Sequence, residues 1–191
     1  MRITSGKARA ISLKSPKGDS TRPATDAARQ AVFSSIGDIV CGARVLDLFA
    51  GTGSYGLEAI SRGAKSAVFV ESARSALDCL KSNIESVKKA AGDFDARVLK
   101  SDCLGLKKSM FLEKFDLLFA DAPYPLLLKK SDEIFAVLAE LSDADTLVIL
   151  EAPGEFEMPE SSQFELVRRL GKASKGKPSQ LIMRKIKNVL E

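Results

Sequence analysis

The sequence predicts an α/β domain with a doubly wound, mostly parallel sheet, and three observations support that prediction. From residue 44 onward, short apolar runs rich in Val, Leu, Ile and Phe alternate with longer amphipathic segments. A glycine-rich GxGxxG stretch directly follows the first of these runs. The chain has 191 residues, 45% of them hydrophobic, which suits one globular domain with a full core.

Strands and helices are expected to alternate through the middle of the chain. The expected strands are 44–49, 66–71, 96–101, 115–121 and 146–152, and the expected helices are 56–63, 73–91, 104–113 and 129–141. In the segment 73–91 the apolar residues fall on one helical stripe, formed by Ala76, Leu77, Leu80, Ile84 and Val87. Strands separated by helices require right-handed crossovers, which produce a parallel sheet covered on both faces.

The two ends of the chain depart from this alternation. The apolar runs 162–171 and 178–187 are joined only by the polar link KASKGK, so an antiparallel hairpin is expected at one edge of the sheet. The N-terminal RITSGKARAISLK alternates polar and apolar residues around a glycine, which is typical of a small hairpin arm. A helix is expected over 25–37, with Thr25 or Asp26 as its N-cap.

The cysteine and histidine content excludes several kinds of chemistry. Cys41, Cys79 and Cys103 form no CxxC pair and the chain has no histidine, so we expect no metal site and no disulfide framework. Ser-His-Asp and Cys-His catalysis are excluded because both need an imidazole. No apolar run reaches about 18 residues and no signal peptide is present, so we expect a cytoplasmic protein without a membrane partner.

Basic residues are concentrated near both ends of the chain. The net charge is +4, yet residues 1–30 contain seven Lys and Arg against two acids, and residues 168–187 contain eight against none. Cationic surfaces attract polyanions and release counterions on binding, so RNA or DNA is the expected partner if the two segments share one face. The alternative is a mixed-charge surface that serves only solubility.

The GxGxxG stretch predicts a site for a nucleoside-bearing cofactor. It lies in DLFAGTGSYG, where the glycines permit a tight turn from strand to helix and a close approach of the ligand to the backbone. Glu71 ends the second expected strand about 20 residues after Gly51, at the position where a carboxylate accepts both ribose hydroxyl hydrogens. Both NAD and S-adenosylmethionine (SAM) carry such a ribose. Asp47 and Asp102 beside the loop favour SAM, because carboxylates suit a cationic ligand better than a pyrophosphate.

The stretch DAPYP, residues 121–125, ends the fourth expected strand and predicts a site for an amine substrate. That strand should lie beside the first, so Asp121 should emerge next to the glycine loop. The Asp121 carboxylate and the Ala122 carbonyl can each accept one hydrogen of a nucleobase amine and orient its nitrogen toward a methyl donor. Pro123 restricts Ala122 to an extended conformation, and Tyr124 can stack on the displaced base.

Several motifs together resemble the RsmD-type SAM-dependent methyltransferases. They are RITSGKARAISLKSP, RPATDAARQAVFSSI, DLFAGTGSYGLEAISRGA, VESARSALDCLKSNI, the SDC after the third strand, and DAPY. The resemblance implies a Rossmann-like class I methyltransferase fold. It also implies methylation of the N2 amine of one guanine in bacterial small-subunit (16S) ribosomal RNA, either free or in an assembling subunit. The resemblance covers most of the chain and is weak after residue 155.

The chain departs from the family pattern at two places. The family usually has DPPF or DPPY at the end of the fourth strand, and Ala122 replaces one of those prolines. A missing proline ring should loosen the turn while keeping the main-chain carbonyl and the acid. The family also commonly has RPTTDRVRE where this chain has RPATDAARQ, so Ala27 replaces a basic residue and Gln30 an acidic one.

The resemblance also implies roles for individual positions. We expect a single domain, with a basic N-terminal arm over 1–24 and a Rossmann-like catalytic core over 25–191. SAM would be bound by Asp47, Phe49, Gly51, Thr52, Gly53, Glu71, Asp102 and Cys103. The guanine would be held by Asp121, Ala122, Pro123 and Tyr124. Ribosomal RNA and the site entrance would involve Lys7, Arg9, Arg22, Thr25, Asp26 and Arg29.

Other functions remain compatible with the residues alone. An adenine N6 methyltransferase, or another nucleic-acid amino-methyltransferase, uses the same kind of acid and carbonyl pair. An NAD(P)-dependent oxidoreductase could use the GTGSYG loop, and a catalytically inactive binding module could retain the fold. A pyrimidine C5 methyltransferase is not expected, because no cysteine follows a proline in the loops after the fourth and fifth strands.

Overall fold

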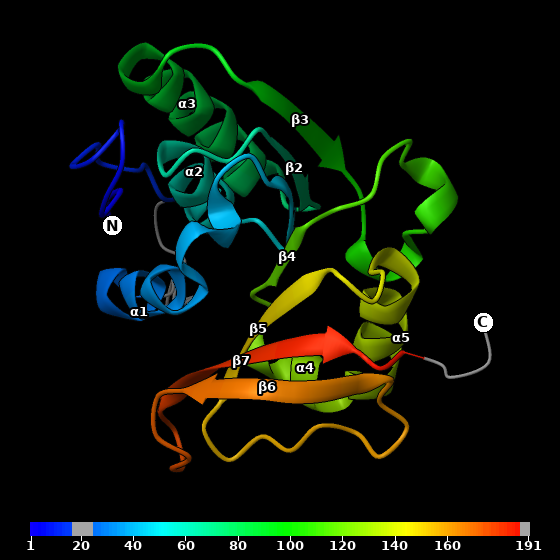
Figure 1. The fold of residues 1–191 in the computed structure, drawn as a ribbon. Coiled ribbons are helices and arrows are strands. Elements are labelled where there is room, and N and C mark those ends of the chain that lie inside the picture. The colour runs from blue at the N-terminus through cyan, green and yellow to red at the C-terminus, as the bar shows by residue number, and fades with distance from the viewer. Residues whose placement is uncertain (17–24, 188–191) are drawn as a thin grey trace.

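A single sheet organises the computed structural model, which describes residues 1–16 and 25–187 (Figure 1). Within these residues the sheet has seven strands in the order β3-β2-β1-β4-β5-β7-β6. The strands are β1 Arg44–Leu48, β2 Ser66–Glu71, β3 Asp95–Lys100, β4 Leu117–Ala120, β5 Leu147–Pro153, β6 Phe164–Leu170 and β7 Pro178–Lys185. The first five are mutually parallel, as the alternation of strands and helices predicts.

Helices cover both faces of the sheet and create two apolar cores. The helices are α1 Asp26–Ile36, α2 Ser54–Ser61, α3 Arg74–Ala91, α4 Tyr124–Lys129 and α5 Ser131–Leu141, with 3-10 turns η1 Gly37–Val40, η2 Cys103–Gly105 and η3 Lys108–Met110. Helices α1, α2 and α3 share a buried cluster with Phe119 and Ile149. Helices α4 and α5 share the other cluster with Leu118 and Val148. Because neighbouring residues of one strand enter different cores, the middle strands are apolar throughout.

The C-terminal hairpin joins this sheet with its second strand inside. β7 pairs antiparallel with both β5 and β6, so β6 forms the edge. The hairpin predicted from the KASKGK link is therefore confirmed. β7 is buried along most of its length because it lies between two strands, whereas β6 is largely exposed.

The N-terminal arm is the expected hairpin, but it is fastened to the domain along its length. Arg2 and Ser12 form an antiparallel bridge, and the Ile3 N–H donates to the Ile11 carbonyl at 2.9 Å. Ile3 is fully buried in the core beneath α1 and α2. The Glu58 carboxylate of α2 accepts the Thr4 N–H at 2.7 Å and the Ser5 N–H at 3.1 Å. The arm is thus part of the folded domain.

Two segments differ from the sequence-based expectation. The prediction of a helix over 104–113 is wrong, since the only helical elements of that region are the 3-10 turns η2 and η3. Leu106 takes an extended conformation between the turns and is almost completely buried. Conversely, DAPYP leads directly into α4, a short helix that periodicity did not indicate. Pro125 fits there because the first helical turn needs no N–H from it.

The expected helix after the arm is confirmed, with its caps. The Thr25 hydroxyl accepts the Ala28 N–H at 3.1 Å, and Gly37 ends α1 at φ +55°. In the part of the chain that the structure describes, no helix has both the length and the apolar character to span a bilayer.

Gly6 is predicted to be essential for docking of the arm. A Cβ added at Gly6 would lie 1.8 Å from the Ser61 carbonyl oxygen, and its φ of +82° already disfavours other residues. We expect Gly6→Ala to lower the free energy of unfolding by about 3 kcal/mol or more, measured by urea denaturation. The matched control is Gly42→Ala, because Gly42 has a similar φ of +74° with no atom within 4 Å of the added Cβ. That control should cost only about 1–2 kcal/mol. Equal losses in the two variants would contradict the proposed contact.

Candidate active site

The glycine loop turns the chain from β1 into α2 and approaches the sheet closely. Gly53 precedes α2 with φ +81°, and Phe49 also has a positive φ of +56°. At Gly56, in the first turn of α2, an added Cβ would lie 2.4 Å from the Phe69 ring and 3.1 Å from a carboxylate oxygen of Asp47. The motif residues therefore allow α2 to begin directly against β1 and β2.

Asp47 lies beneath this loop and holds it. Its side chain is almost fully buried, and its Oδ2 accepts the Gly56 N–H at 2.9 Å. Burial raises the pKa of Asp47 to about 8, and the negative charge of Glu71 contributes to the increase. The predicted cofactor residue Asp47 therefore contacts the loop backbone directly, and any effect on a ligand would act through the loop.

Glu71 ends β2 where the sequence predicts a ribose-binding carboxylate. Its Oε2 accepts the Gly51 N–H at 2.8 Å, and its Oε1 accepts the N–H groups of Ser72 and Ala73 at 2.7 Å each. These bonds orient the carboxylate against the glycine loop. A carboxylate oxygen has two acceptor positions, so Oε2 retains one for a ligand hydroxyl.

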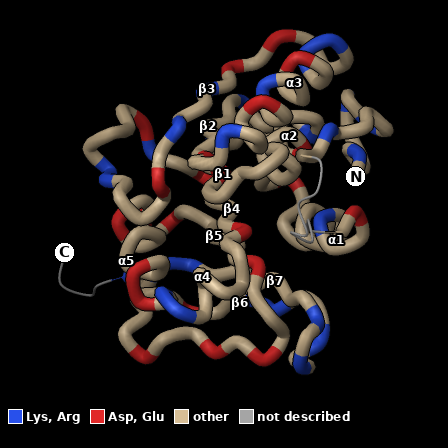
Figure 2. The backbone as a smooth tube through the Cα atoms, turned by 180° about the vertical axis from the view of Figure 1, so that it is seen from behind, with Lys and Arg blue, Asp and Glu red and all other residues tan. Residues whose placement is uncertain are grey.

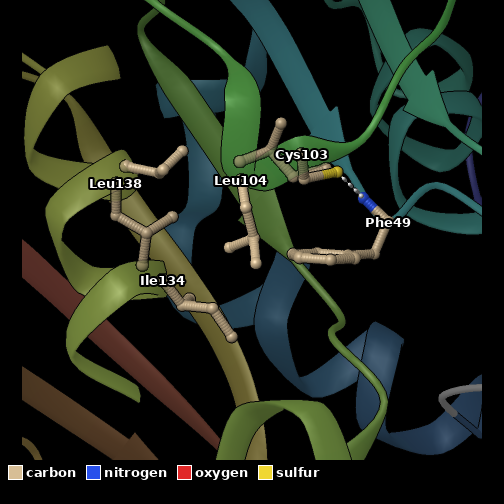
Figure 3. A pocket seen from close by; sticks show the side chains of 7 residues that line it. Phe49, Cys103, Leu104, Ile134 and Leu138 are labelled. Carbon is tan, nitrogen blue, oxygen red and sulfur yellow. Dashed lines mark hydrogen bonds between the residues drawn. The ribbon is translucent and has the colours of Figure 1, made fainter. Parts of the chain in front are cut away.

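The segment after β3 provides the other wall of the site (Figure 3). Asp102 is exposed, and its Oδ1 accepts the Leu104 N–H at 3.0 Å. The Cys103 sulfur accepts the Phe49 N–H at 3.3 Å, which links this segment to the glycine loop. Burial raises the pKa of the Cys103 thiol to about 12, so the group stays protonated and is not nucleophilic at neutral pH.

An apolar pocket lies between the glycine loop and α5. Figure 3 shows the Phe49 ring on one side of Leu104, with Ile134 and Leu138 of α5 on the other side. The lining residues are Leu48, Phe49, Cys103, Leu104, Ile134, Val137 and Leu138. The pocket thus adjoins two predicted cofactor residues and offers a flat aromatic and aliphatic surface.

Asp121 emerges from β4 beside the glycine loop, as its position in the motif predicts. Its N–H donates to the Leu48 carbonyl at 3.4 Å, which keeps the ends of β1 and β4 together. Burial, followed by the charges of Glu151 and Asp47, raises the pKa of the Asp121 carboxyl well above its usual range. A carboxylate in this environment is a stronger base than an exposed one.

The rest of DAPYP connects Asp121 to α4. Ala122 is almost fully buried and packs in the core on the α5 side of the sheet. The Pro123 carbonyl accepts the N–H groups of Leu126 and Leu127 at 2.8 and 2.9 Å. Tyr124 is half-buried at the first position of α4. The motif is therefore held at both ends, by the sheet and by a helix.

Glu151 is a site residue that the sequence analysis missed. It lies in β5, is almost completely buried, and its Oε2 accepts the Tyr55 hydroxyl at 3.2 Å and the Gln180 amide at 3.4 Å. Burial raises the pKa of the Glu151 carboxyl, although both hydrogen bonds lower it. A signal was present in the sequence, because Glu151 follows the apolar run LVIL as Asp121 follows FDLLFA.

The predicted RNA residues have different surroundings. Lys7 and Arg9 are exposed on the arm, Thr25 caps α1, and Arg22 lies outside the described residues. Arg29 was expected to contact RNA or the site entrance, yet its side chain is fully buried. Arg29 pairs with Asp26 at 2.9 Å and with Glu58 at 3.4 Å, and it donates to the Arg2 carbonyl. Two carboxylates and the arm therefore enclose the guanidinium, and Arg29 holds α1, α2 and the arm together.

The arm, α1 and the turn between β6 and β7 lie along one side of the molecule. Figure 1 shows all three on the left, and Figure 2 shows Lys and Arg positions on the arm and on the β6–β7 turn. Arg168 of β6 donates to the Ser35 hydroxyl of α1 at 3.1 Å, which joins the hairpin to α1. The arm and the β6–β7 turn are thus on the same side, whereas the last cations of β7 are not, since Lys185 donates to the Ala139 carbonyl of α5 at 2.8 Å. Among the described residues, no group of three or more Cys, Asp or Glu is arranged to bind a metal ion.

Comparison with known proteins identifies this architecture. The solved structure named putative methyltransferase yhhF from Escherichia coli superimposes with a TM-score of 0.76 and 27% identity, covering 97% of this chain and 98% of that one. The sheet with its antiparallel β7, the glycine loop and this likeness define the class I methyltransferase fold. The expected fold class is therefore confirmed.

The chain belongs to the RsmD-type methyltransferase family. The family model described as "Conserved hypothetical protein 95" matches residues 1–176. The putative rRNA methyltransferase YlbH of Bacillus subtilis is 34% identical over 168 residues, covering 84% of this chain and 87% of the relative. Ribosomal RNA small subunit methyltransferase D of Escherichia coli K12 is 31% identical over 163 residues, covering 83% and 78%. The expected family is confirmed, and the oxidoreductase alternative finds no support.

Asp47 is predicted to make stability depend on pH. Its pKa of about 8 in the folded protein exceeds that of an unfolded aspartate, so ionisation destabilises the fold progressively between about pH 4 and pH 8. An asparagine in its place would keep an oxygen for the Gly56 N–H and cannot ionise. We therefore expect Asp47→Asn to stabilise the fold by at least about 1 kcal/mol at pH 8 and by much less at pH 4. Urea denaturation across this range tests the prediction, and a difference that does not depend on pH would refute it.

Proposed function

We propose that the protein transfers a methyl group from SAM to the N2 amine of a guanine in small-subunit (16S) ribosomal RNA. The observation that carries this proposal is the position of Asp121, which ends β4 against the glycine loop and carries a raised pKa. The relatives named as ribosomal RNA methyltransferases support the substrate class. The proposal places cofactor and base at the carboxyl ends of β1, β2 and β4, where ligands bind in open α/β sheets.

The residues around the glycine loop fit SAM. SAM supplies an electrophilic methyl group on a positively charged sulfur. Glu71 Oε2 would accept one ribose hydroxyl, and the apolar residues around Phe49 and Leu104 would pack against the adenine ring. Asp102 is exposed at the edge of the same pocket and can accept a hydrogen bond from an amine. Gly51, Thr52 and Gly53 would provide the backbone wall, with Asp47 fixing the loop from below.

Asp121 would orient and deprotonate the guanine amine. The lone pair of N2 is delocalised into the ring, so the nitrogen must be held in position and must lose one proton as it gains a methyl group. The raised pKa of Asp121 suits it to accept that proton. The Ala122 carbonyl would accept the second amine hydrogen, and Tyr124 would stack on the base.

The basic side of the molecule would bind the RNA backbone. Lys7 and Arg9 are exposed on the arm, and the turn between β6 and β7 adds Lys172, Lys175 and Lys177. Lysine and arginine contacts to phosphates position an RNA without reading its sequence. The fixed arm would therefore hold the RNA at a constant distance from Asp121.

Replacement of Asp121 is predicted to remove methyl transfer and to spare cofactor binding. Wild-type protein incubated with ribosomal RNA or small subunits and labelled SAM should form N2-methylguanosine, detected by nucleoside mass spectrometry. We expect Asp121→Ala to lower the rate at least about 1000-fold while SAM affinity stays within about tenfold, because the lost group acts on the substrate nitrogen. The control Asp145→Ala removes a carboxylate that is 93% exposed and should leave the rate unchanged. N6-methyladenosine as the product would instead identify an adenine methyltransferase.

Replacement of Glu71 is predicted to have the opposite effect. Loss of its carboxylate removes the expected ribose acceptors and the bond to Gly51, so we expect Glu71→Ala to weaken SAM binding at least about tenfold. Saturating SAM should restore much of the methylation rate. Isothermal calorimetry with SAM and with NAD measures the effect, and unaltered SAM affinity in the variant would remove Glu71 from the cofactor site.

A further inference from the structure

Glu151 lies beside Asp121 on the same face of the sheet. Ala120 pairs with Leu150 in the parallel register of β4 and β5, so Asp121 and Glu151 are the next residues on neighbouring strands. Side chains alternate along a strand, which places Asp121 on the face of Phe119 and Glu151 on the face of Ile149. Phe119 and Ile149 belong to the same buried cluster. The two carboxyl groups therefore leave neighbouring strands on the same side of the sheet.

One oxygen of Glu151 is held by the protein and the other is available. Tyr55 stacks on Phe119 with ring centroids 5.0 Å apart, and its hydroxyl donates to Glu151 Oε2. The Gln180 amide donates to the same oxygen. Within the described residues, no donor reaches Oε1. The fully enclosed side-chain oxygens and nitrogens that make no hydrogen bond, in this part of the chain, are Arg44 Nε and Ser174 Oγ. Oε1 of Glu151 is not among them, so it retains a small accessible surface.

A purely structural role does not explain this arrangement. Glu151 is buried and Asp121 half-buried, so the two neighbouring carboxyl groups repel each other when both are ionised, and each loses hydration. A hydrogen-bonded glutamine at position 151 would avoid that repulsion. Carboxyl groups kept together despite this cost are typical of sites that bind a ligand with several donors.

The edge of guanine that carries N2 presents adjacent donors. N1 carries one hydrogen and the neighbouring N2 amine carries two, whereas adenine presents an acceptor at N1 beside its N6 amine. On the basis of the function proposed above, we propose that Glu151 Oε1 accepts the guanine N1–H while Asp121 accepts a hydrogen of N2. Glu151 is then a specificity-determining residue for guanine. The two donors of the base would also relieve the repulsion between the carboxylates.

A base that keeps the 2-amino group but has a hydrogen-bond acceptor at N1, where guanine has a donor, tests this proposal. 2-Aminopurine retains the 2-amino group, has an acceptor at N1 and lacks the O6 oxygen. An RNA or subunit that the wild-type protein methylates is prepared with guanine or with 2-aminopurine at the modified position, and kcat/KM is measured for both. Any effect of the missing O6 is shared by all protein variants, so the change in the ratio between variants reports on N1.

We expect the wild-type protein to prefer guanine over 2-aminopurine by at least about 100-fold, and Glu151→Gln to reduce that preference at least about tenfold. A neutral amide both weakens the bond to N1–H and can donate to the acceptor of 2-aminopurine. The matched control is Glu157→Gln, which makes the same change at an exposed glutamate after β5 and should keep the ratio within about twofold. SAM affinity, measured by calorimetry, should be unaffected in both variants.

The possible failures are distinguishable. If the wild-type protein forms no N2-methylguanosine, the proposed function fails and the role of Glu151 fails with it. If the wild-type protein is active and Glu151→Gln keeps the full preference for guanine, only the role of Glu151 is overturned. Should Glu151→Gln lose SAM binding, the comparison is made with Tyr55→Phe, which keeps the ring on Phe119 and frees Oε2. A preference lowered about threefold or more supports the proposal, and an unchanged one overturns it.

Discussion

The crowding of carboxyl groups toward the carboxyl ends of three neighbouring parallel strands is the constraint around which this structure is organised. The register of the neighbouring strands β1, β4 and β5 brings Asp47, Asp121 and Glu151 to one region near the carboxyl ends of the central strands. Asp121 has its pKa raised by burial and by both other acids. The cohesion of an apolar sheet, packed on both faces, offsets this local electrostatic cost. The result is that the Asp121 carboxyl group has a raised pKa and follows a backbone N–H that is bonded to Leu48.

Helix α2 connects this carboxylate cluster to the surface that would meet RNA. All eight of its residues are buried, and its polar groups point to different parts of the molecule. The Gly56 N–H holds Asp47, and the Tyr55 hydroxyl holds Glu151. One and two turns further on, Glu58 and Ser61 bind the backbone of the arm that carries Lys7 and Arg9. The arm is therefore positioned relative to the reacting atoms through a rigid helix, which favours a defined distance between bound phosphates and the modified base.

Periodicity predicted the parallel strands and the long helices because burial on one or both faces leaves a local pattern. It failed where long-range contacts decide the conformation. Leu106 is buried in an extended conformation between two 3-10 turns, and its packing against distant residues leaves no local signal. Arg29 looked like a surface charge because its partner Glu58 is 29 residues away in the chain. The glycine loop, Glu71 and Asp121 were predictable, since strand ends and turn chemistry are local. Glu151 showed the same local pattern, but no motif marked it.

The replacement of the usual proline by Ala122 illustrates how tertiary contacts can substitute for covalent rigidity. The sequence indicated a looser turn, because alanine leaves φ free where proline restricts it. In the folded chain Ala122 is almost completely buried, the preceding N–H of Asp121 is tied to Leu48, and the following residue, Pro123, is fixed by its ring and by two hydrogen bonds to α4. The freedom that alanine adds belongs mainly to the unfolded chain, where it raises the entropy cost of folding. The substitution should therefore affect stability more than the direction of the Ala122 carbonyl, and so it is compatible with an active enzyme.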